Sequence, residues 1–408
     1  MTRARILADY VAGGTTAAEF DYMDGVTSNV QTQLDAKLPL AGGTMTGDLV
    51  PATPMSHRNM IINGDMRVSQ RATAYNNLSS ATKVIDRYTI RTSGASGAFD
   101  VTQDANSPVG FNNSLKITND ATETIDGTSD YLGISYKIEA QDCQQLGYGS
   151  ATAKTSTLSF WVRSTVTGTG VIYIQIEDDS YKQWSGSYTI SASDTWEYKT
   201  LTIPANTTST INDDNGLGLD INWFIFAGSA YSSGGSLSSS WEAAATNKQG
   251  YGQTNFMGGA TGRIFQITGI QFELGSNATP FEHRTYSEEL AKCMRYFQKY
   301  RNESSGNADM VTGWAQSTSA ARLIQPFPVW MRVGPSLTYP QAATTMYVSD
   351  GVSASNQCSA LTAHAYMSDQ IMDIAFTANN SDLTAFRHYY LFLGAASETY
   401  YLGFDAEL

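Results

Sequence analysis

Short runs of β-branched and aromatic residues, alternating with polar residues, dominate the chain from about residue 57 to residue 286. Five clear runs are LSFWVRS (158–164), GVIYIQIED (170–178), WEYKTLTIP (196–204), INWFIFAG (221–228) and RIFQITGIQFELG (263–275). Clusters of Gly, Ser, Thr and Asp separate the runs, as turns separate strands. Strands at this spacing, without long helical periods between them, predict a mainly β protein with a central jelly-roll β-sandwich over residues 56–285.

One later segment has the periodicity of a helix. In TYSEELAKCMRYFQKY (285–300), Ser287 can cap the first turn, and the acidic residues that follow suit a helix N-terminus. The apolar stripe consists of Leu290, Met294 and Phe297. We therefore predict a linking helix over residues 286–301.

The pattern of strands returns after that segment. The runs ARLIQPFPVWM (321–331), SLTYPQAA (336–343) and HYYLFLGA (388–395) are short and rich in β-branched or aromatic residues. They predict a second, smaller C-terminal β-domain over residues 302–408.

The beginning of the chain differs from both β regions. Residues 16–37 read as two short helical pieces broken at Gly25. Met23, Val26 and Val30 fall at the a and d spacing of a coiled coil, and Leu34 lies just beside that stripe. Such a helix cannot bury its apolar stripe alone. Either a partner chain covers it, or the helix packs on the body of its own chain.

Composition narrows the classes of function. The 408 residues include 25 Lys and Arg against 38 Asp and Glu, a net charge of −13, with only 15% of residues charged and 41% hydrophobic. The chain can bury a sizeable core, while its acidic balance disfavours nucleic acid and anionic membrane surfaces. Without a stretch of about eighteen apolar residues or a signal peptide, we expect synthesis in a cytoplasm and no membrane insertion. Three widely spaced cysteines are expected to be free, buried thiols.

Four stretches carry a resemblance to one class of proteins. They are TAAEFDYMDGVTSNVQTQLDAKLPLAGGTMTGDL (16–49), NMIINGDMRVSQRA (59–72) with VIDRYTI (84–90), GRIFQITGIQFELGSNATPFEHRTYSEELAKCMRYFQKY (262–300) and PFPVWMRVGPSLT (326–338). In this order they resemble the stem repeat, the opening and the close of the central β-domain, and the start of the distal domain in tail-fibre and receptor-binding proteins of tailed bacteriophages.

The resemblance implies an intertwined homotrimer located in the virion as a tail fibre. Residues 1–55 would then attach to the phage tail, the baseplate or another virion protein and would also trimerise, with Met23, Val26, Val30 and Leu34 as candidates for the trimer axis. The central domain would be similar to a carbohydrate-binding module, and distal parts would bind the host surface. Because only one N-terminal unit is present, the fibre would be short.

Sugars are bound by flat aromatic faces together with side chains that hydrogen-bond hydroxyl groups. Three places offer such groups in polar surroundings: the loop 230–256, the turn 178–188 and the C-terminal β-domain. The candidate glycan-binding residues are Tyr231, Trp241 and Tyr251 in the loop, Tyr181 and Trp184 in the turn, and His364 and Tyr366 in the C-terminal domain. For the loop, the alternative is that these aromatic residues pack at a domain or subunit boundary, and a packing role is equally open for the turn.

Evidence for catalysis is thin. The four histidines lack metal-binding spacing, no GxSxG motif occurs, and DDNG (213–216) reads as a turn rather than a Ca²⁺ loop. We expect no enzyme activity and no cofactor. The predicted function is a tail fibre that adheres to a host glycan such as lipopolysaccharide. The alternatives are a purely structural virion adaptor and, less favoured, a polysaccharide depolymerase.

Overall fold

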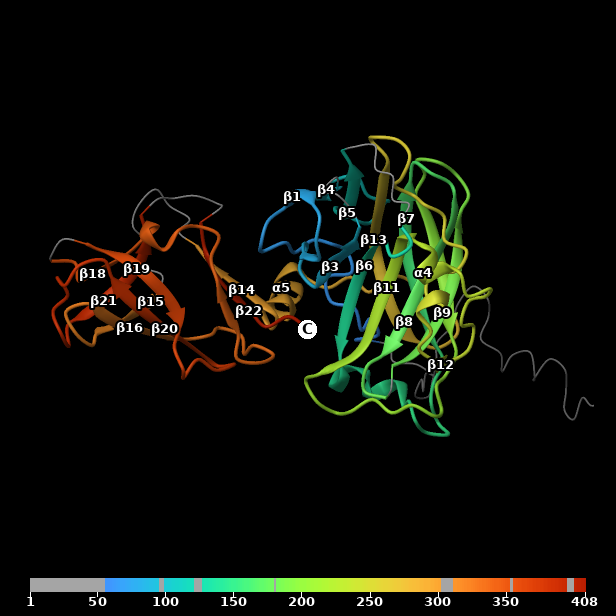
Figure 1. Cartoon of the computed structure of the whole chain (residues 1–408). Helices are drawn as coiled ribbons and strands as arrows, with labels where there is room; N and C mark the ends of the chain where they lie inside the picture. The colour runs from blue at the N-terminus through green and yellow to red at the C-terminus, as the bar shows by residue number, and fades with distance from the viewer. Residues whose placement is uncertain are drawn as a thin grey trace, which may run out of the picture. The chain divides into compact units, whose positions relative to one another are not determined.

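Two antiparallel sheets face each other across one large hydrophobic core in the first part of the structure (Figure 1). The computed structural model describes residues 56–94, 99–120, 127–179, 181–301, 311–352, 355–394 and 400–408. The predicted attachment segment, with Met23, Val26, Val30 and Leu34, lies outside these residues.

The six-stranded sheet has the order β1 (Ala74–Leu78), β4 (Phe99–Asp104), β5 (Ser114–Asn119), β13 (Ile264–Leu274), β7 (Ser156–Ser164) and β10 (Glu197–Ile203). The seven-stranded sheet has the order β12 (Glu242–Ala243), β9 (Lys182–Ile190), β8 (Gly168–Ile176), β11 (Leu217–Ala227), β6 (Tyr131–Glu139), β3 (Tyr88–Ser93) and β2 (Thr82–Lys83). Each of the five alternating runs found in the sequence forms one of these strands. The predicted mainly β architecture with a central sandwich is therefore confirmed.

Strand alternation decides which side chains of the seven-stranded sheet remain available for function. In β11, Ile221, Trp223 and Ile225 enter the core between the sheets. Successive side chains of a strand point to opposite faces, so Asn222 and Phe224 lie on the outer face of the sheet. On this outer face, the polar Asn222 lies between Ser135 of β6 and Tyr173 of β8.

A closed six-stranded barrel with its own hydrophobic core forms the later part of the structure. Its strand order is β15 (Val311–Ala315), β16 (Ala320–Pro326), β20 (Ile371–Ala378), β19 (Asn356–Ala363), β18 (Met346–Ser349) and β21 (His388–Leu393). Beside it is a three-stranded sheet of β14 (Phe297–Tyr300), β22 (Leu402–Asp405) and β17 (Ser336–Thr338). The predicted small C-terminal β-domain is thus present.

The remaining described elements are short helices. They are α4 (Ser229–Ser232), α5 (Tyr286–Met294) and the 3-10 turns η1 (Ala140–Leu146), η2 (Thr246–Lys248) and η3 (Ala343–Thr345). Within the described part of the chain, no helix is long and apolar enough to cross a membrane.

Helix α5 differs from the prediction at both ends. Its N-cap is Thr285, not Ser287, because Thr285 and Glu288 form a reciprocal capping box. The helix ends at Met294 instead of continuing to residue 301, since Phe297–Tyr300 pairs with β22 as strand β14. Pairing with a strand more than a hundred residues away outweighs the local helical pattern.

The last residues of the sequence contact the sandwich through ion pairs. Glu407 binds Arg87, and both side chains are buried. Asp405 accepts from Arg71 at 3.1 Å and from Lys83 at 2.8 Å. These contacts tie β22 to residues at the start of the sandwich.

Candidate functional site

A small recess opens on the outer face of the seven-stranded sheet, where β3, β6 and β11 lie side by side. Arg91 of β3 is opposite Gly133 of β6, and Gly133 is opposite Phe224 of β11. Gly133 has no side chain, so a gap remains between the side chains of Arg91 and Phe224. The register of three strands therefore fixes the position of the recess.

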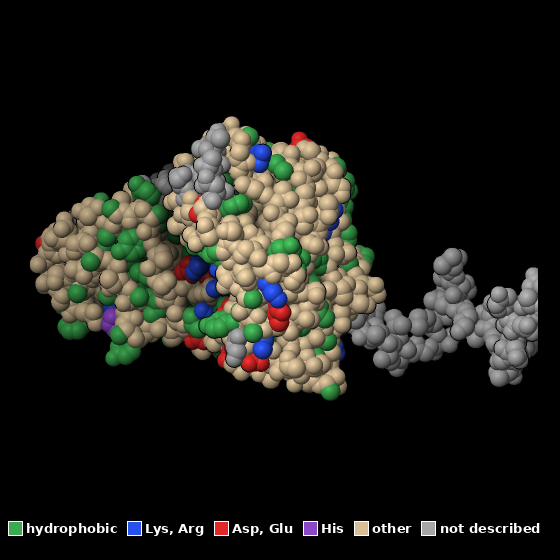
Figure 2. Space-filling view, turned by 45° about the vertical axis from the view of Figure 1, so that its right-hand side comes forward, with side chains coloured by type: hydrophobic (Ala, Val, Ile, Leu, Met, Phe, Trp, Pro, Cys, Tyr) green, Lys and Arg blue, Asp and Glu red, His purple; other side chains and the backbone are tan. Residues whose placement is uncertain are grey.

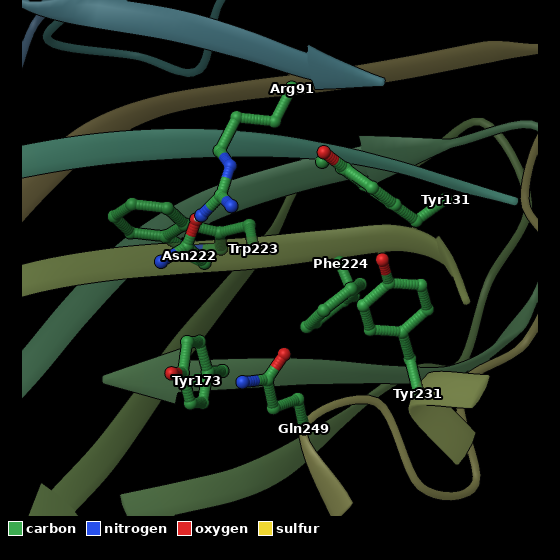
Figure 3. A pocket seen from close by; sticks show the side chains of 9 residues that line it. Arg91, Tyr131, Tyr173, Asn222, Trp223, Phe224, Tyr231 and Gln249 are labelled. Atoms are coloured by element: carbon green, nitrogen blue, oxygen red, sulfur yellow. The ribbon is translucent and has the colours of Figure 1, made fainter. Parts of the chain in front are cut away.

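Aromatic rings form one wall of the recess. The Tyr231 ring lies 5.1 Å from that of Tyr131, edge to face, and 6.2 Å from that of Phe224. Figure 3 shows these three rings gathered together, with Tyr173 and Gln249 on the other side of Phe224. The recess holds about 30 Å³. That volume accommodates one water-sized group and excludes a sugar ring.

Polar groups form the opposite wall. The Arg91 guanidinium donates to Asn222 Oδ1 at 3.0 Å and lies 3.4 Å from Asp220 Oδ2, while Ser135 Oγ donates to Asp220 Oδ1 at 2.7 Å. Asn222 is only 5% exposed, yet its Nδ2 has no hydrogen-bond partner among the described residues. A buried amide without a partner is costly, which makes it a candidate for binding an external acceptor.

Residue 231 reaches the recess because the segment after β11 is fixed by backbone hydrogen bonds. Ala230 N donates to Thr128 O at 2.8 Å, and Gly250 N donates to Tyr231 O at 2.9 Å. These bonds place α4 and Gln249, which follows η2, over the end of the sheet. Tyr231 and Gln249, distant in the loop, thus line the same recess.

Burial keeps the phenols of the recess neutral. It raises the pKa of Tyr173 above the usual tyrosine value, and the nearby Asp220 carboxylate adds to this effect. Burial, followed by the neighbouring Tyr131, also raises the pKa of Tyr231. Both hydroxyls are protonated at neutral pH, but the Tyr173 hydroxyl already donates to Gln175 Oε1, which leaves its oxygen as an acceptor.

Of the loop residues that the sequence pointed to, Tyr231 lines the recess. Trp241 instead donates from Nε1 to Pro204 O at 2.8 Å, and its ring meets that of Tyr148 at 5.6 Å. Tyr251 is 36% exposed and lies outside the recess lining. The loop thus combines one recess residue with residues that contact the sandwich or the solvent.

The turn 178–188 separates its two candidates. Tyr181 follows β8 at the hairpin tip, where it is 53% exposed with a positive φ of 54°. Trp184, three residues later in β9, is buried in the core between the sheets. The structure therefore leaves Tyr181 available to solvent and gives Trp184 a packing position.

In the barrel, the two predicted residues lie together. The rings of His364 and Tyr366 are 5.2 Å apart, and Tyr366 is 71% exposed. Arg322 accompanies them, with its guanidinium 5.2 Å from the centre of the Tyr366 ring.

Sequence reasoning missed most of the recess. The missed residues are Arg91, Tyr131, Gly133, Tyr173, Asn222, Trp223, Phe224 and Gln249. One signal was present: in INWFIFAG, Asn222 alternates with aliphatic and aromatic core residues, which places a polar group on the outer face of a central strand. The strand order that brings Arg91 and Tyr173 beside it could not be read from the pattern.

Metal and thiol chemistry find no support among the described residues. No group of three or more His, Cys, Asp or Glu side chains there could hold a metal ion. Cys143, Cys293 and Cys358 are free and buried, as expected. Asp214 in the DDNG segment accepts from Gly216 N at 2.8 Å, an interaction typical of a turn.

Comparison with known proteins gives only distant structural likenesses. No protein family model matches the sequence, and no curated protein matches it. Among solved structures, a domain of tailspike protein 4 of bacteriophage CBA120 is 14% identical, with a TM-score of 0.30 over 53% of this chain and 21% of that one. A putative sugar binding protein from Bacteroides thetaiotaomicron is 12% identical, with a TM-score of 0.30 over 53% of this chain and 100% of that one.

TmCBM61, solved in complex with β-1,4-galactotriose, is 12% identical, with a TM-score of 0.26 over 54% of this chain and 99% of that one. At such identities and TM-scores, these likenesses carry no argument about function.

Proposed function

We propose that this chain is a tail-fibre protein of a tailed bacteriophage that binds a host-surface glycan in the recess beside Asn222. The observation that carries glycan binding is the unpartnered Nδ2 of Asn222, buried between a fixed arginine and a cluster of aromatic rings. Binding, rather than bond cleavage, is the proposed activity.

A sugar hydroxyl or hydroxymethyl group suits this recess. It is close in size to the water-sized group that the recess admits, and it accepts a hydrogen bond from Asn222 while donating to a tyrosine oxygen. The sugar ring would stay outside, against Tyr131 and Tyr231, whose side chains are only partly buried. Aromatic faces and polar amides in one place are what recognition of a pyranose requires.

The role in a virion rests on the resemblance of the four sequence stretches and on the surface. Figure 2 shows a face on which backbone and uncharged polar side chains predominate over charged ones. Such a surface suits a β-protein that acts outside cells after synthesis in the host. The proposed assembly is a homotrimer attached to the tail through residues 1–55. A structural adaptor without receptor binding is the main alternative.

Asn222→Leu tests the glycan site directly. Leucine has a similar size but lacks the amide, so the variant removes the unpartnered Nδ2 and also the Oδ1 that accepts from Arg91, which keeps its ion pair with Asp220. The two losses act on stability in opposite directions, and a melting curve checks that the variant folds. Binding should nevertheless weaken about tenfold, which corresponds to about 1.4 kcal/mol. Tyr251→Ala, in the loop that contributes Tyr231 but outside the recess, is the control.

The probe is an array of neutral and acidic bacterial oligosaccharides, followed by calorimetric titration with the one that gives the strongest signal. Equal affinity of Asn222→Leu and the original protein would reject the recess as the site. The tail-fibre role is tested by adding purified protein to host cells before phage. If adsorption is undiminished at saturating protein, the structural adaptor replaces the receptor-binding fibre.

A further inference from the structure

A row of four residues crosses the outer face of the barrel, outside the recess described above. Trp314 is opposite Arg322, Arg322 is opposite Ala375, and Ala375 is opposite Thr362. Their strand neighbours Ala315, Leu323, Ile374 and Leu361 point into the barrel core. Alternation therefore places all four residues of the row on the surface.

Two exposed rings flank the arginine of this row. Trp314 is 39% exposed and Tyr366 is 71% exposed. The Arg322 guanidinium carbon lies 5.9 Å from the centre of the Trp314 ring and 5.2 Å from that of Tyr366. Both rings are accessible to a ligand, in contrast to Trp184 and Trp223 of the sandwich, which are buried.

Arg322 is held rigidly and its charge is matched. Asp373, whose side chain is 1% exposed, accepts from Arg322 Nε at 3.0 Å and from Nη2 at 2.6 Å. His364 Nδ1 lies 3.3 Å from the same carboxylate. A guanidinium that is already paired favours an uncharged ligand over an acidic one.

The row continues into an open groove. Thr362 and Ala363 of β19 form one side of this groove, and residues 336–339, which include β17, form the other. The groove has a volume of about 560 Å³, within the usual range for ligand sites. From Trp314 to Thr362 the row crosses three strand spacings, or roughly 14 Å. This length suits a short chain of sugar rings.

We propose that this face of the barrel is a second carbohydrate site, which binds an uncharged oligosaccharide laid across the strands from Trp314 to the groove beside Thr362. Trp314 and Tyr366 stack on sugar rings, Arg322 donates to a hydroxyl between them, and a further sugar unit enters the groove. The isolated rings separated by polar groups favour a sugar chain over a protein partner, which needs a continuous apolar patch. The inference deepens the proposed function, because it rests on the chain being a glycan-binding protein.

The test compares five proteins on the same oligosaccharide array: the original chain, Asn222→Leu, the double variant Trp314→Ala with Tyr366→Ala, the conservative double variant Trp314→Phe with Tyr366→Phe, and Phe386→Ala. Phe386 is 86% exposed and lies outside the row, so it controls for loss of an exposed ring. A neutral oligosaccharide that occupies the barrel face should bind Phe386→Ala as tightly as the original chain and should bind the double variant at least about tenfold more weakly. Asn222→Leu shows which of these oligosaccharides depend on the recess instead. Trp314→Phe with Tyr366→Phe should restore most of the affinity.

The outcomes separate the two sites. If the double variant loses a neutral oligosaccharide that Asn222→Leu retains, the barrel site stands even when the recess contributes nothing. If the double variant binds every oligosaccharide as the original chain does, the barrel proposal is wrong while the recess is unaffected. If light scattering shows that the double variant lowers the mass of the assembly, the face is an interface between copies and the proposal is also overturned.

Discussion

The buried pair of Arg87 and Glu407 should be essential for holding the last strand on the sandwich. Arg87 is 1% and Glu407 7% exposed at their side chains. Arg87 also donates to Lys137 O at 2.6 Å, and its guanidinium carbon lies 3.3 Å from the centre of the Tyr296 ring. Burial, the largest single effect, would lower the pKa of Arg87, but Glu407, Tyr296 and Tyr136 together raise it, so the guanidinium stays charged. Arg87→Met would leave Glu407 buried without this partner.

The free-energy cost of Arg87→Met follows from the burial of this ion pair. Removing one partner of a buried ion pair costs about 3–5 kcal/mol, whereas an exposed pair contributes about 0.2–1 kcal/mol. Lys83→Met provides the comparison, since Lys83 is 37% exposed and pairs with Asp405 at 2.8 Å. Glu407 keeps a weaker contact with Arg71 at 3.6 Å, so we place Arg87→Met near the lower end, at about 3 kcal/mol.

Hydrogen exchange on the full chain measures this change locally. Ala406 N donates to Tyr296 O at 2.8 Å, and that amide should exchange about a hundredfold faster in Arg87→Met if opening of the last strand becomes easier by about 3 kcal/mol. Lys83→Met should change the rate about fivefold at most. In the double variant Arg87→Met with Glu407→Gln, the increase in exchange rate, expressed as a free energy, should be smaller than the sum of the increases in the two single variants. Similar exchange rates in Arg87→Met and Lys83→Met would refute the argument from burial.

Three further changes test other parts of the structure. Burial alone would raise the pKa of Glu139, but hydrogen bonds from Arg295 at 2.8 Å lower it. The ionised Glu139 carboxylate therefore stabilises the fold at pH values above the usual pKa of 4.5, and this contribution is lost as the pH falls through the lowered pKa. Glu139→Gln should therefore lose less stability on acidification than the original chain, as urea titrations at several pH values would show, and equal losses would contradict this sign. Gly269 has a φ of 62°, and a Cβ there would lie 2.7 Å from the Phe111 ring. Gly269→Ala should therefore lower the unfolding free energy by about 1–3 kcal/mol, and an unchanged melting curve would count against this prediction. Burial raises the pKa of Cys143 and Cys293 well above normal and that of Cys358 to about 12, so a thiol reagent should react only after denaturation, and rapid labelling of native protein would disprove their burial.

Strand pattern made most of the sandwich predictable, because alternation is a local property. The run INWFIFAG lies within β11, and the polar Asn222 within it marked the outer face. Strand order is not local: nothing in the runs shows that β11 lies between β6 and β8, and that order creates the recess. Tyr231 was found in advance because an aromatic residue in a polar loop is visible in sequence alone.

The helix over residues 286–301 shows where local pattern fails. Phe297 completes an apolar stripe with Leu290 and Met294, yet it belongs to β14, where it is opposite Asp405 of β22. The Ser287 cap failed for a different reason, since Thr285 forms the two-way capping box with Glu288 and Ser287 cannot. Both errors concern boundaries that tertiary contacts and side-chain geometry set.

Paired strands fix part of each proposed glycan site, while Tyr231, Gln249 and Tyr366 come from segments outside the strands, and this affects how the sites would bind. Register fixes Arg91 opposite Gly133 and Trp314 opposite Arg322 before any ligand arrives. Little side-chain freedom is then lost on binding, which favours selectivity for one arrangement of hydroxyls. Each site nevertheless offers few contacts, one a recess of about 30 Å³ and the other an open face, so single-site affinity should be weak. Firm adhesion would then require several sites to act together, as two sites on each of three linked copies would allow.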